Sequence, residues 1–251
     1  MDYSIIIPAY NEADRIGPVL AEILSEAPGI SVLVIDDGSR DATAKVAREH
    51  GAQVITLPYN SGYGVAMQTG FRYAVQQGVT VVISMDADGQ HQPKDISRLV
   101  EKYNQGYDMV VGARDRKSQA SLARLFGNGM YNRIASYITA HKIEDLTSGF
   151  RVVSAEKFKQ FLYLLPNGFS YPTTSTMAFF RAGFSVGYLS ITAPERIGES
   201  HINILKDGAR FFLIIFKIGT LYSPMKLFFP ASALFFLTGI FYYIYTFFSD
   251  G

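Results

Sequence analysis

Short apolar runs alternate with segments of helical periodicity over roughly the first two-thirds of the chain. In Glu12–Leu24, for example, the apolar side chains recur every three or four positions and fall on one face of a helix. The pattern predicts strands at Ser4–Pro8, Ser31–Ile35, Gln53–Leu57, Val79–Met85 and Asp108–Gly112, with helices at Glu12–Leu24, Ala42–His50 and Val65–Gln76 between them. Strands that are apolar on both faces and separated by helices predict an α/β fold with a mostly parallel, covered sheet.

The C-terminal part has a different pattern. Between Asn203 and Gly219, polar residues recur at steps of three, four or seven opposite apolar ones, which predicts one amphipathic helix. Leu227–Phe248 contains no charged residue and, at ~1.5 Å per residue, would extend about 33 Å as a helix, enough to span a bilayer core. We therefore expect a catalytic domain over 1–202, a juxtamembrane amphipathic helix over 203–222 and a transmembrane segment over 223–251. Packed core helices are the alternative for both C-terminal segments.

Composition narrows the choice of partners. The 251 residues are 48% hydrophobic and 18% charged, and the formal net charge is only +1. Such a balance offers no general basic field for nucleic acid, so we expect none to bind, and any site for a polyanion must be local. The chain has no cysteine, which excludes disulfides and thiolate chemistry.

Polar clusters follow the predicted strands at the point where each strand ends. They are Pro8–Glu12, Asp36–Ser39, Asn60–Gly64 and Asp86–Gln90. In a parallel α/β sheet, ligands bind beyond the carboxyl ends of the strands, so these clusters should converge on one edge. Any single cluster could be an ordinary helix cap or turn, but the presence of all of them favours a binding site.

The cluster after the Val81–Ser84 run carries the clearest chemistry. If Asp86 and Asp88 lie on an extended segment, their carboxylates point the same way and form a claw for a hard divalent cation, Mg²⁺ or Mn²⁺. Gln90 adds a neutral side chain to the same region. Such a cation would stabilise the charge of a departing diphosphate. An Asp-rich turn without metal is the alternative.

Three segments together resemble the successive motifs of the family 2 glycosyltransferases: residues 7–12 (IPAYNE), 36–43 (DDGSRDAT) and 86–93 (DADGQHQP). The resemblance extends over roughly 1–203 and implies a GT-A fold. It further implies that the nucleotide is held by Pro8, Tyr10, Glu12, Asp37 and Asp86, and the metal and diphosphate by Asp86, Asp88 and Gln90.

Two further segments resemble family elements that border the acceptor. They are 111–114 (VGAR) and 145–151 (DLTSGFR). Arg114 could clamp a phosphate through its fork of donors, although an arginine in such a position is often a simple ion-pair partner. In relatives whose acceptor is a hydroxyl, Asp145 is the natural general base.

Residues 196–201 (RIGESH) resemble a segment of the polyprenyl-phosphate transferases, with His201 where those enzymes usually carry lysine. A lipid phosphate has a second pKa near ~6, so it can attack without losing a proton, and its site needs cations more than a base. The acceptor-phosphate candidates are Arg114, Arg124, Arg133, Arg151, Arg196, Ser200 and His201. The candidates for catalysis are Asp88, Arg114, Asp145 and Arg196.

These patterns predict an enzyme, dependent on Mg²⁺ or Mn²⁺, that transfers a hexose with inversion from a UDP- or GDP-sugar to undecaprenyl or dolichyl phosphate. Arg210, Lys217 and Lys226 precede the apolar span and Asp250 follows it, which predicts a membrane protein with its catalytic domain facing the cytoplasm. A transferase acting on a saccharide or protein hydroxyl, and an inactive nucleotide-sugar-binding membrane protein, are the alternatives. Homo-oligomerisation is left open.

Overall fold

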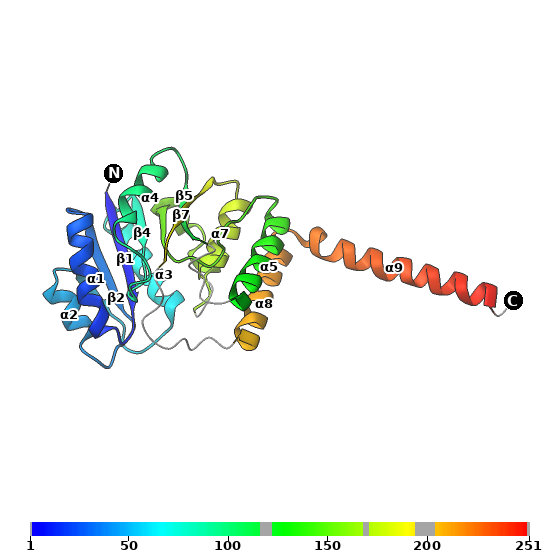
Figure 1. The fold of residues 1–251 in the computed structure, drawn as a ribbon, viewed down its shortest axis with the longest axis horizontal. Coiled ribbons are helices and arrows are strands. Elements are labelled where there is room, and N and C mark those ends of the chain that lie inside the picture. The colour runs from blue at the N-terminus through cyan, green and yellow to red at the C-terminus, as the bar shows by residue number, and fades with distance from the viewer. Residues whose placement is uncertain (1, 116–121, 168–170, 194–203, 250–251) are drawn as a thin grey trace.

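The computed structural model describes residues 2–115, 122–167, 171–193 and 204–249. At 122–126 and 204–211 it describes the backbone alone. A mixed sheet in the order β3-β2-β1-β4-β6-β5-β7 forms its centre (Figure 1). The strands are β1 (Tyr3–Ala9), β2 (Ser31–Asp36), β3 (Gln53–Thr56), β4 (Val81–Ser84), β5 (Met109–Arg114), β6 (Arg151–Ser154) and β7 (Val186–Ile191). The predicted strands and the predicted α/β class are confirmed, with shifts of a few residues at the ends.

One strand runs against the others and determines where the site forms. β6 pairs antiparallel with β4 on one side and with β5 on the other, so that Ser84 lies opposite Arg151 and Val111 also lies opposite Arg151. The amino end of β6 therefore meets the carboxyl ends of β4 and β5 at one edge of the sheet. The antiparallel strand between β4 and β5 brings residues 145–150 beside Asp86 and Arg114, which precede them by more than thirty positions.

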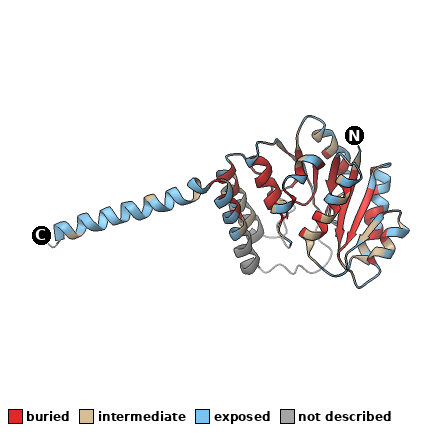
Figure 2. Cartoon of the chain, turned by 180° about the vertical axis from the view of Figure 1, so that it is seen from behind, coloured by how far each residue is buried: buried red, intermediate tan, exposed pale blue. Residues whose placement is uncertain are grey.

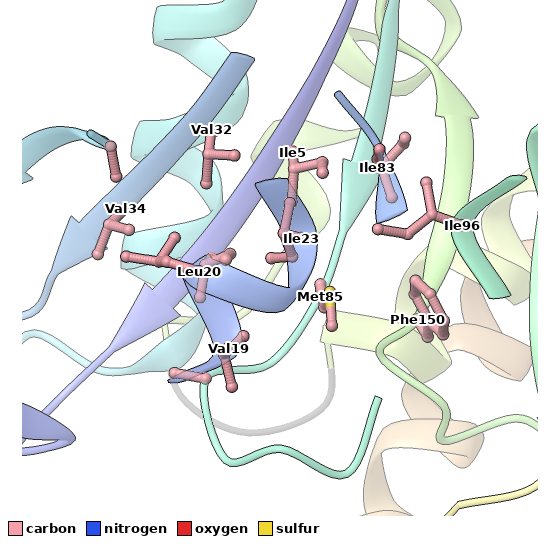
Figure 3. Close-up of a cluster of buried hydrophobic side chains, with 14 of the residues drawn as sticks. Ile5, Val19, Leu20, Ile23, Val32, Val34, Ile83, Met85, Ile96 and Phe150 are labelled. Carbon is pink, nitrogen blue, oxygen red and sulfur yellow. The ribbon is translucent and has the colours of Figure 1, made fainter. Parts of the chain in front are cut away.

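Helices cover both faces of the sheet because its strands are apolar on both sides. On one face lie α1 (Ala13–Glu26), α2 (Thr43–Glu49) and α4 (Asp95–Tyr103). Figure 3 shows Leu20 and Ile23 of α1 and Ile96 of α4 among the buried strand residues of this face. On the other face lie α3 (Tyr63–Gln76), α6 (Ala155–Lys159), the 3₁₀ turn η2 (Leu162–Leu164) and α7 (Tyr171–Arg181).

A third apolar cluster joins the helices at the end of the sheet that carries β7. α5 (Leu122–Thr139) and α8 (Ile204–Tyr222) pack with α7 through residues that include Ile138, Phe180, Ile215 and Ile218. The amphipathic helix expected over 203–222 thus corresponds to α8. Its apolar residues do not all pack on the domain. Ile215 is buried against the domain, with 1% exposure, whereas Phe212 is 50% exposed.

The last helix, α9 (Pro224–Ser249), projects away from the domain (Figure 1). It is 26 residues long, has none of its residues buried and is long and apolar enough to cross a membrane (Figure 2). Its junction with α8 is tied to the domain, because Lys226 Nζ donates to the carbonyls of Tyr137 (3.0 Å) and Ile138 (3.2 Å) at the end of α5.

Candidate active site

The two aspartates of the expected metal claw lie just beyond β4 at the carboxyl edge of the sheet. Asp86 and Asp88 are both half-buried, while Ala87 between them is buried in the core. The expectation that the pair lies on an extended segment is wrong for Asp88, because β4 ends at Ser84 and residues 87 and 88 form a turn. Gly89 follows with a φ of 77°, a left-handed conformation that glycine adopts without strain and that lets the chain reverse here.

Neighbouring groups hold Asp86 in place. The Tyr63 hydroxyl donates a hydrogen bond to its Oδ1 (2.9 Å), and the backbone N–H of Asp86 donates to Nδ1 of His91 (2.9 Å). Because His91 Nδ1 accepts, the ring proton is assigned to Nε2, which lies 3.6 Å from Asp86 Oδ2. Gly149 passes so close that an added Cβ would lie 3.0 Å from the same Oδ2.

Arg114 and Asp145 form a bidentate ion pair on the other side of the site. Arg114 Nε donates to Asp145 Oδ2 (2.8 Å) and Nη2 donates to Oδ1 (2.9 Å). Asp145 also accepts hydrogen bonds from the backbone N–H groups of Arg114, Thr147 and Ser148. The Arg114 Nη1 group makes no hydrogen bond within the described residues and is the part of the guanidinium that a ligand could engage.

The surroundings fix the ionisation of this pair. Burial opposes charge on Asp145, but the Arg114 guanidinium and the hydrogen bonds outweigh it and hold the pKa of Asp145 below its usual range. Burial likewise opposes charge on Arg114, and Asp145, followed by Asp86 and Asp88, raises the pKa of Arg114. A carboxylate so stabilised is a weak proton acceptor, which argues against Asp145 as a general base.

The residues present fit a divalent cation bound together with a substrate. Among the described residues, no group of three or more His, Asp or Glu side chains could hold a metal. Mg²⁺ and Mn²⁺ at phosphate sites commonly use one or two carboxylates and take their other ligands from phosphate and water. Asp86 and Asp88, with Gln90 beside them, match that smaller set. Their ligand roles remain predictions.

The expected nucleotide residues lie at the neighbouring ends of β1 and β2. Tyr10 is 39% exposed and Pro8 is buried. Glu12 pairs with Arg15 (2.8 Å) and its N–H donates to Thr43. Asp37 is 4% exposed, and its two oxygens accept the N–H groups of Ser61 (2.7 Å) and Gly62 (2.8 Å).

The Asp37 carboxylate therefore holds the start of α3 in place. Direct contact of Asp37 with the nucleoside remains a prediction, as do the nucleotide roles of Pro8, Tyr10 and Glu12. All four nevertheless lie at the same sheet edge as Asp86, because β1 pairs in parallel with both β2 and β4.

The expected acceptor cations are only partly brought together. Arg151 is wrong as an acceptor ligand, because it is 0% exposed and donates to Ser148 O (2.7 Å) and to Ser175 Oγ and Thr176 Oγ1 (2.8 Å each) in the interior. Arg133 is exposed on α5. The Arg124 side chain, Arg196, Ser200 and His201 lie outside the described residues.

Sequence reasoning did not select Tyr63 or His91. Tyr63 sits inside the Asn60–Gly64 cluster, which resembled a tight turn, and its contact with Asp86 spans 23 positions of the chain. His91 stacks on Phe150 at 5.0 Å between ring centroids, a packing that links the loop after β4 to the segment before β6. Both contacts depend on strand order, which local pattern does not reveal.

Comparison with known proteins agrees with this geometry. Residues 4–162 match glycosyl transferase family 2, and residues 223–251 match the GtrB C-terminal hairpin. The chain is 30% identical to a dolichyl-phosphate hexose transferase of Haloferax volcanii over 86% of this chain and 93% of the relative. It is 28% identical to a polyprenol monophosphomannose synthase of Mycolicibacterium smegmatis over 85% and 84% of the two chains.

Among solved structures, the glucosyl-3-phosphoglycerate synthase of Mycobacterium tuberculosis in complex with Mn²⁺ and UDP superposes with a TM-score of 0.66. The match covers 86% of this chain and 79% of that enzyme at 19% identity, and it shows likeness of fold. The resemblance noted in the motifs and the GT-A fold it implied are confirmed. The matched hairpin, together with the exposed α9, indicates membrane association.

Proposed function

The chain belongs to glycosyl transferase family 2, and from this we propose that it transfers a hexose from a UDP- or GDP-sugar to a polyprenyl phosphate at the membrane surface. Relatives named for transfer to polyprenol, dolichyl phosphate and undecaprenyl phosphate align over most of the chain and support this acceptor class. Inversion at the sugar carbon follows from the family resemblance.

The observation that carries the choice of acceptor is the ion pair between Arg114 and Asp145. A hydroxyl acceptor requires a group that removes its proton, but Asp145, the natural candidate, is a weak proton acceptor because Arg114 and backbone N–H groups hold its pKa below the usual range. A phosphate acceptor arrives already ionised and requires positive charge. Arg114 supplies such charge close to Asp86 and Asp88.

The residues of the site then have separate tasks. The loops after β1 and β2 bind the nucleoside. Asp86, Asp88 and Gln90 would hold Mg²⁺ or Mn²⁺, and the cation would offset the charge that develops on the departing diphosphate. Arg114 orients the acceptor phosphate beside the sugar carbon. The bond from the sugar carbon to the donor diphosphate breaks as a bond to the lipid phosphate oxygen forms.

The membrane segments place this site beside its lipid. α9 spans the bilayer, and the exposed apolar side chains of α8, such as Phe212, Leu213 and Phe216, enter the headgroup layer. The excess of basic residues before α9 favours a catalytic domain on the cytoplasmic side, where nucleotide sugars are made.

The test uses the full chain in detergent with undecaprenyl or dolichyl phosphate, a panel of labelled UDP- and GDP-sugars, and Mg²⁺ or Mn²⁺. We expect label from one sugar to enter the lipid phase, and the Asp88→Asn variant to lose this transfer. Label appearing only on a water-soluble saccharide or on protein would refute the lipid acceptor.

A further inference from the structure

We propose that the Tyr63 hydroxyl is a positioning group for the reaction. It orients the Asp86 carboxylate toward the metal and couples that carboxylate to the loop after β2, which carries Asp37 and binds the nucleoside in the proposed function. The inference rests on the proposed function, since it takes Asp86 to be a metal ligand. Tyr63 is the first residue of α3, and its hydroxyl donates to Asp86 Oδ1 at 2.9 Å.

The phenol is a dependable donor at this position. An ordinary phenol has a pKa of about 10, so it carries its proton at neutral pH and can donate to a carboxylate. The Tyr63 ring lies 6.0 Å from that of Tyr171, and an added Cβ on Gly149 would lie 3.2 Å from the Tyr63 hydroxyl. Close packing on these sides restricts the hydroxyl to the position it has beside Asp86.

The bond fixes the orientation of the carboxylate. A free carboxylate rotates about its Cβ–Cγ bond, and binding a metal then costs the entropy of that rotation. With Oδ1 held by Tyr63 and the backbone N–H of Asp86 held by His91, the Oδ2 atom is presented in a defined direction. Groups that orient a metal ligand in this way typically contribute 10- to 100-fold in metal affinity or activity.

The segment 61–63, which contains Tyr63, also contacts the loop after β2. Asp37, at the end of β2, accepts the N–H groups of Ser61 and Gly62, directly before Tyr63. Residues 61–63 therefore bind the carboxylate of Asp37 through their backbone and the carboxylate of Asp86 through a side chain. One turn, residues 61–63, would therefore align a nucleotide bound at the loop after β2 with a cation bound at Asp86.

The experiment compares the full-length Tyr63→Phe variant with the wild type. Free Mn²⁺ is measured by electron paramagnetic resonance in the presence of UDP or GDP, and the Mn²⁺ dependence of glycolipid synthesis is measured in parallel. We expect Tyr63→Phe to weaken Mn²⁺ binding 10- to 100-fold, with a smaller loss of rate at saturating Mn²⁺. Thermal unfolding of the variant should stay close to that of the wild type, because the ring and its packing are retained.

Two controls separate the possible failures. Tyr73→Phe removes another phenol from α3 that makes no side-chain hydrogen bond within the described part of the chain, and it should bind Mn²⁺ like the wild type. Asp86→Asn should abolish Mn²⁺ binding. If Asp86→Asn binds Mn²⁺ normally, the metal assignment itself fails. If Asp86→Asn loses Mn²⁺ but Tyr63→Phe retains wild-type affinity, whatever its rate, the positioning role of Tyr63 is overturned.

Discussion

Replacing Asp145 by Asn tests whether this carboxylate acts as a base or as the partner of Arg114. The asparagine side chain has nearly the same shape, but it carries no charge, and one of its two polar atoms can no longer accept a hydrogen bond. In the protein Asp145 is 4% exposed, and its carboxylate accepts hydrogen bonds from both the side chain and the backbone of Arg114. The substitution leaves the guanidinium without its counter-ion.

The expected loss of stability follows from the burial of the pair. Breaking a fully buried ion pair costs ~3–5 kcal/mol, and since the Arg114 side chain keeps 27% exposure we expect about 2–3 kcal/mol here. For a chain of this size that corresponds to a fall in Tm of about 5–10 °C. Transfer to the lipid phosphate should fall about 10- to 100-fold, because Arg114 is displaced, which is at or below the lower end of the ~10²–10⁴-fold that a general base contributes.

The pH dependence adds a second signature. The folded-state pKa of Asp145 is lowered, so the ion pair contributes stability above the unfolded pKa of about 3.9 and loses it as the pH falls through the lower folded value. The difference in Tm between the wild type and Asp145→Asn should thus be full at neutral pH and shrink below about pH 4.

The assay is differential scanning fluorimetry across pH alongside transfer to lipid phosphate and donor binding. Wild-type Tm together with a near-complete loss of turnover at unchanged donor binding would refute the ion-pair interpretation and restore Asp145 as a base.

Three further outcomes are expected. Gly149→Ala places a methyl group 3.0 Å from Asp86 Oδ2 and 3.2 Å from the Tyr63 hydroxyl, so the Mn²⁺ concentration needed for half-maximal transfer should rise at least ~10-fold, measured by metal titration, while circular dichroism stays unchanged. Arg151→Met should lower the free energy of unfolding by roughly 2–4 kcal/mol, because its interior hydrogen-bond partners lose their donor, and an unchanged denaturation midpoint would contradict a structural role. Ending the chain at Ser223 should release the protein from sodium carbonate-washed membranes, as judged by sedimentation; full retention in the pellet would show that α9 is not the anchor.

The parallel half of the fold could be predicted because its signals are local. Apolar runs such as Ser31–Ile35 and helical periodicity such as that of Glu12–Leu24 each mark one element, and both appear in the structure within a few residues. β6 and β7 were not predicted, and β6 is only four residues long, so its pairing with β4 and β5 depends on contacts that no short window contains.

The same distinction applies to the site. Asp86 and Asp88 could be found because the motif is contiguous and follows a strand. Arg151 was misplaced because an arginine in a polar motif suggests a ligand, whereas in the fold it is the buried first residue of β6, hydrogen-bonded to hydroxyls of α7. Tyr63 was passed over for the opposite reason, since its partner is distant in sequence and nothing in the Asn60–Gly64 cluster indicates that the aromatic ring turns toward β4.

The reversed strand also explains how two anionic substrates can meet in one small site. β4 and β5 are both neighbours of β6, so their carboxyl ends are separated by two strand spacings, about 10 Å. The segment leading into β6 fills that interval, with Gly149 against Asp86 and Asp145 against Arg114. In the proposed reaction, a cation bound by the carboxylates would hold the donor diphosphate on the β4 side, and the Arg114 guanidinium would hold the acceptor phosphate on the β5 side, so that each anion meets a positive group. Because one short segment sets both positions, a substitution that shifts it should change metal affinity and acceptor use together. Replacing Tyr63, which reaches Asp86 from α3, should lower metal affinity without changing acceptor use.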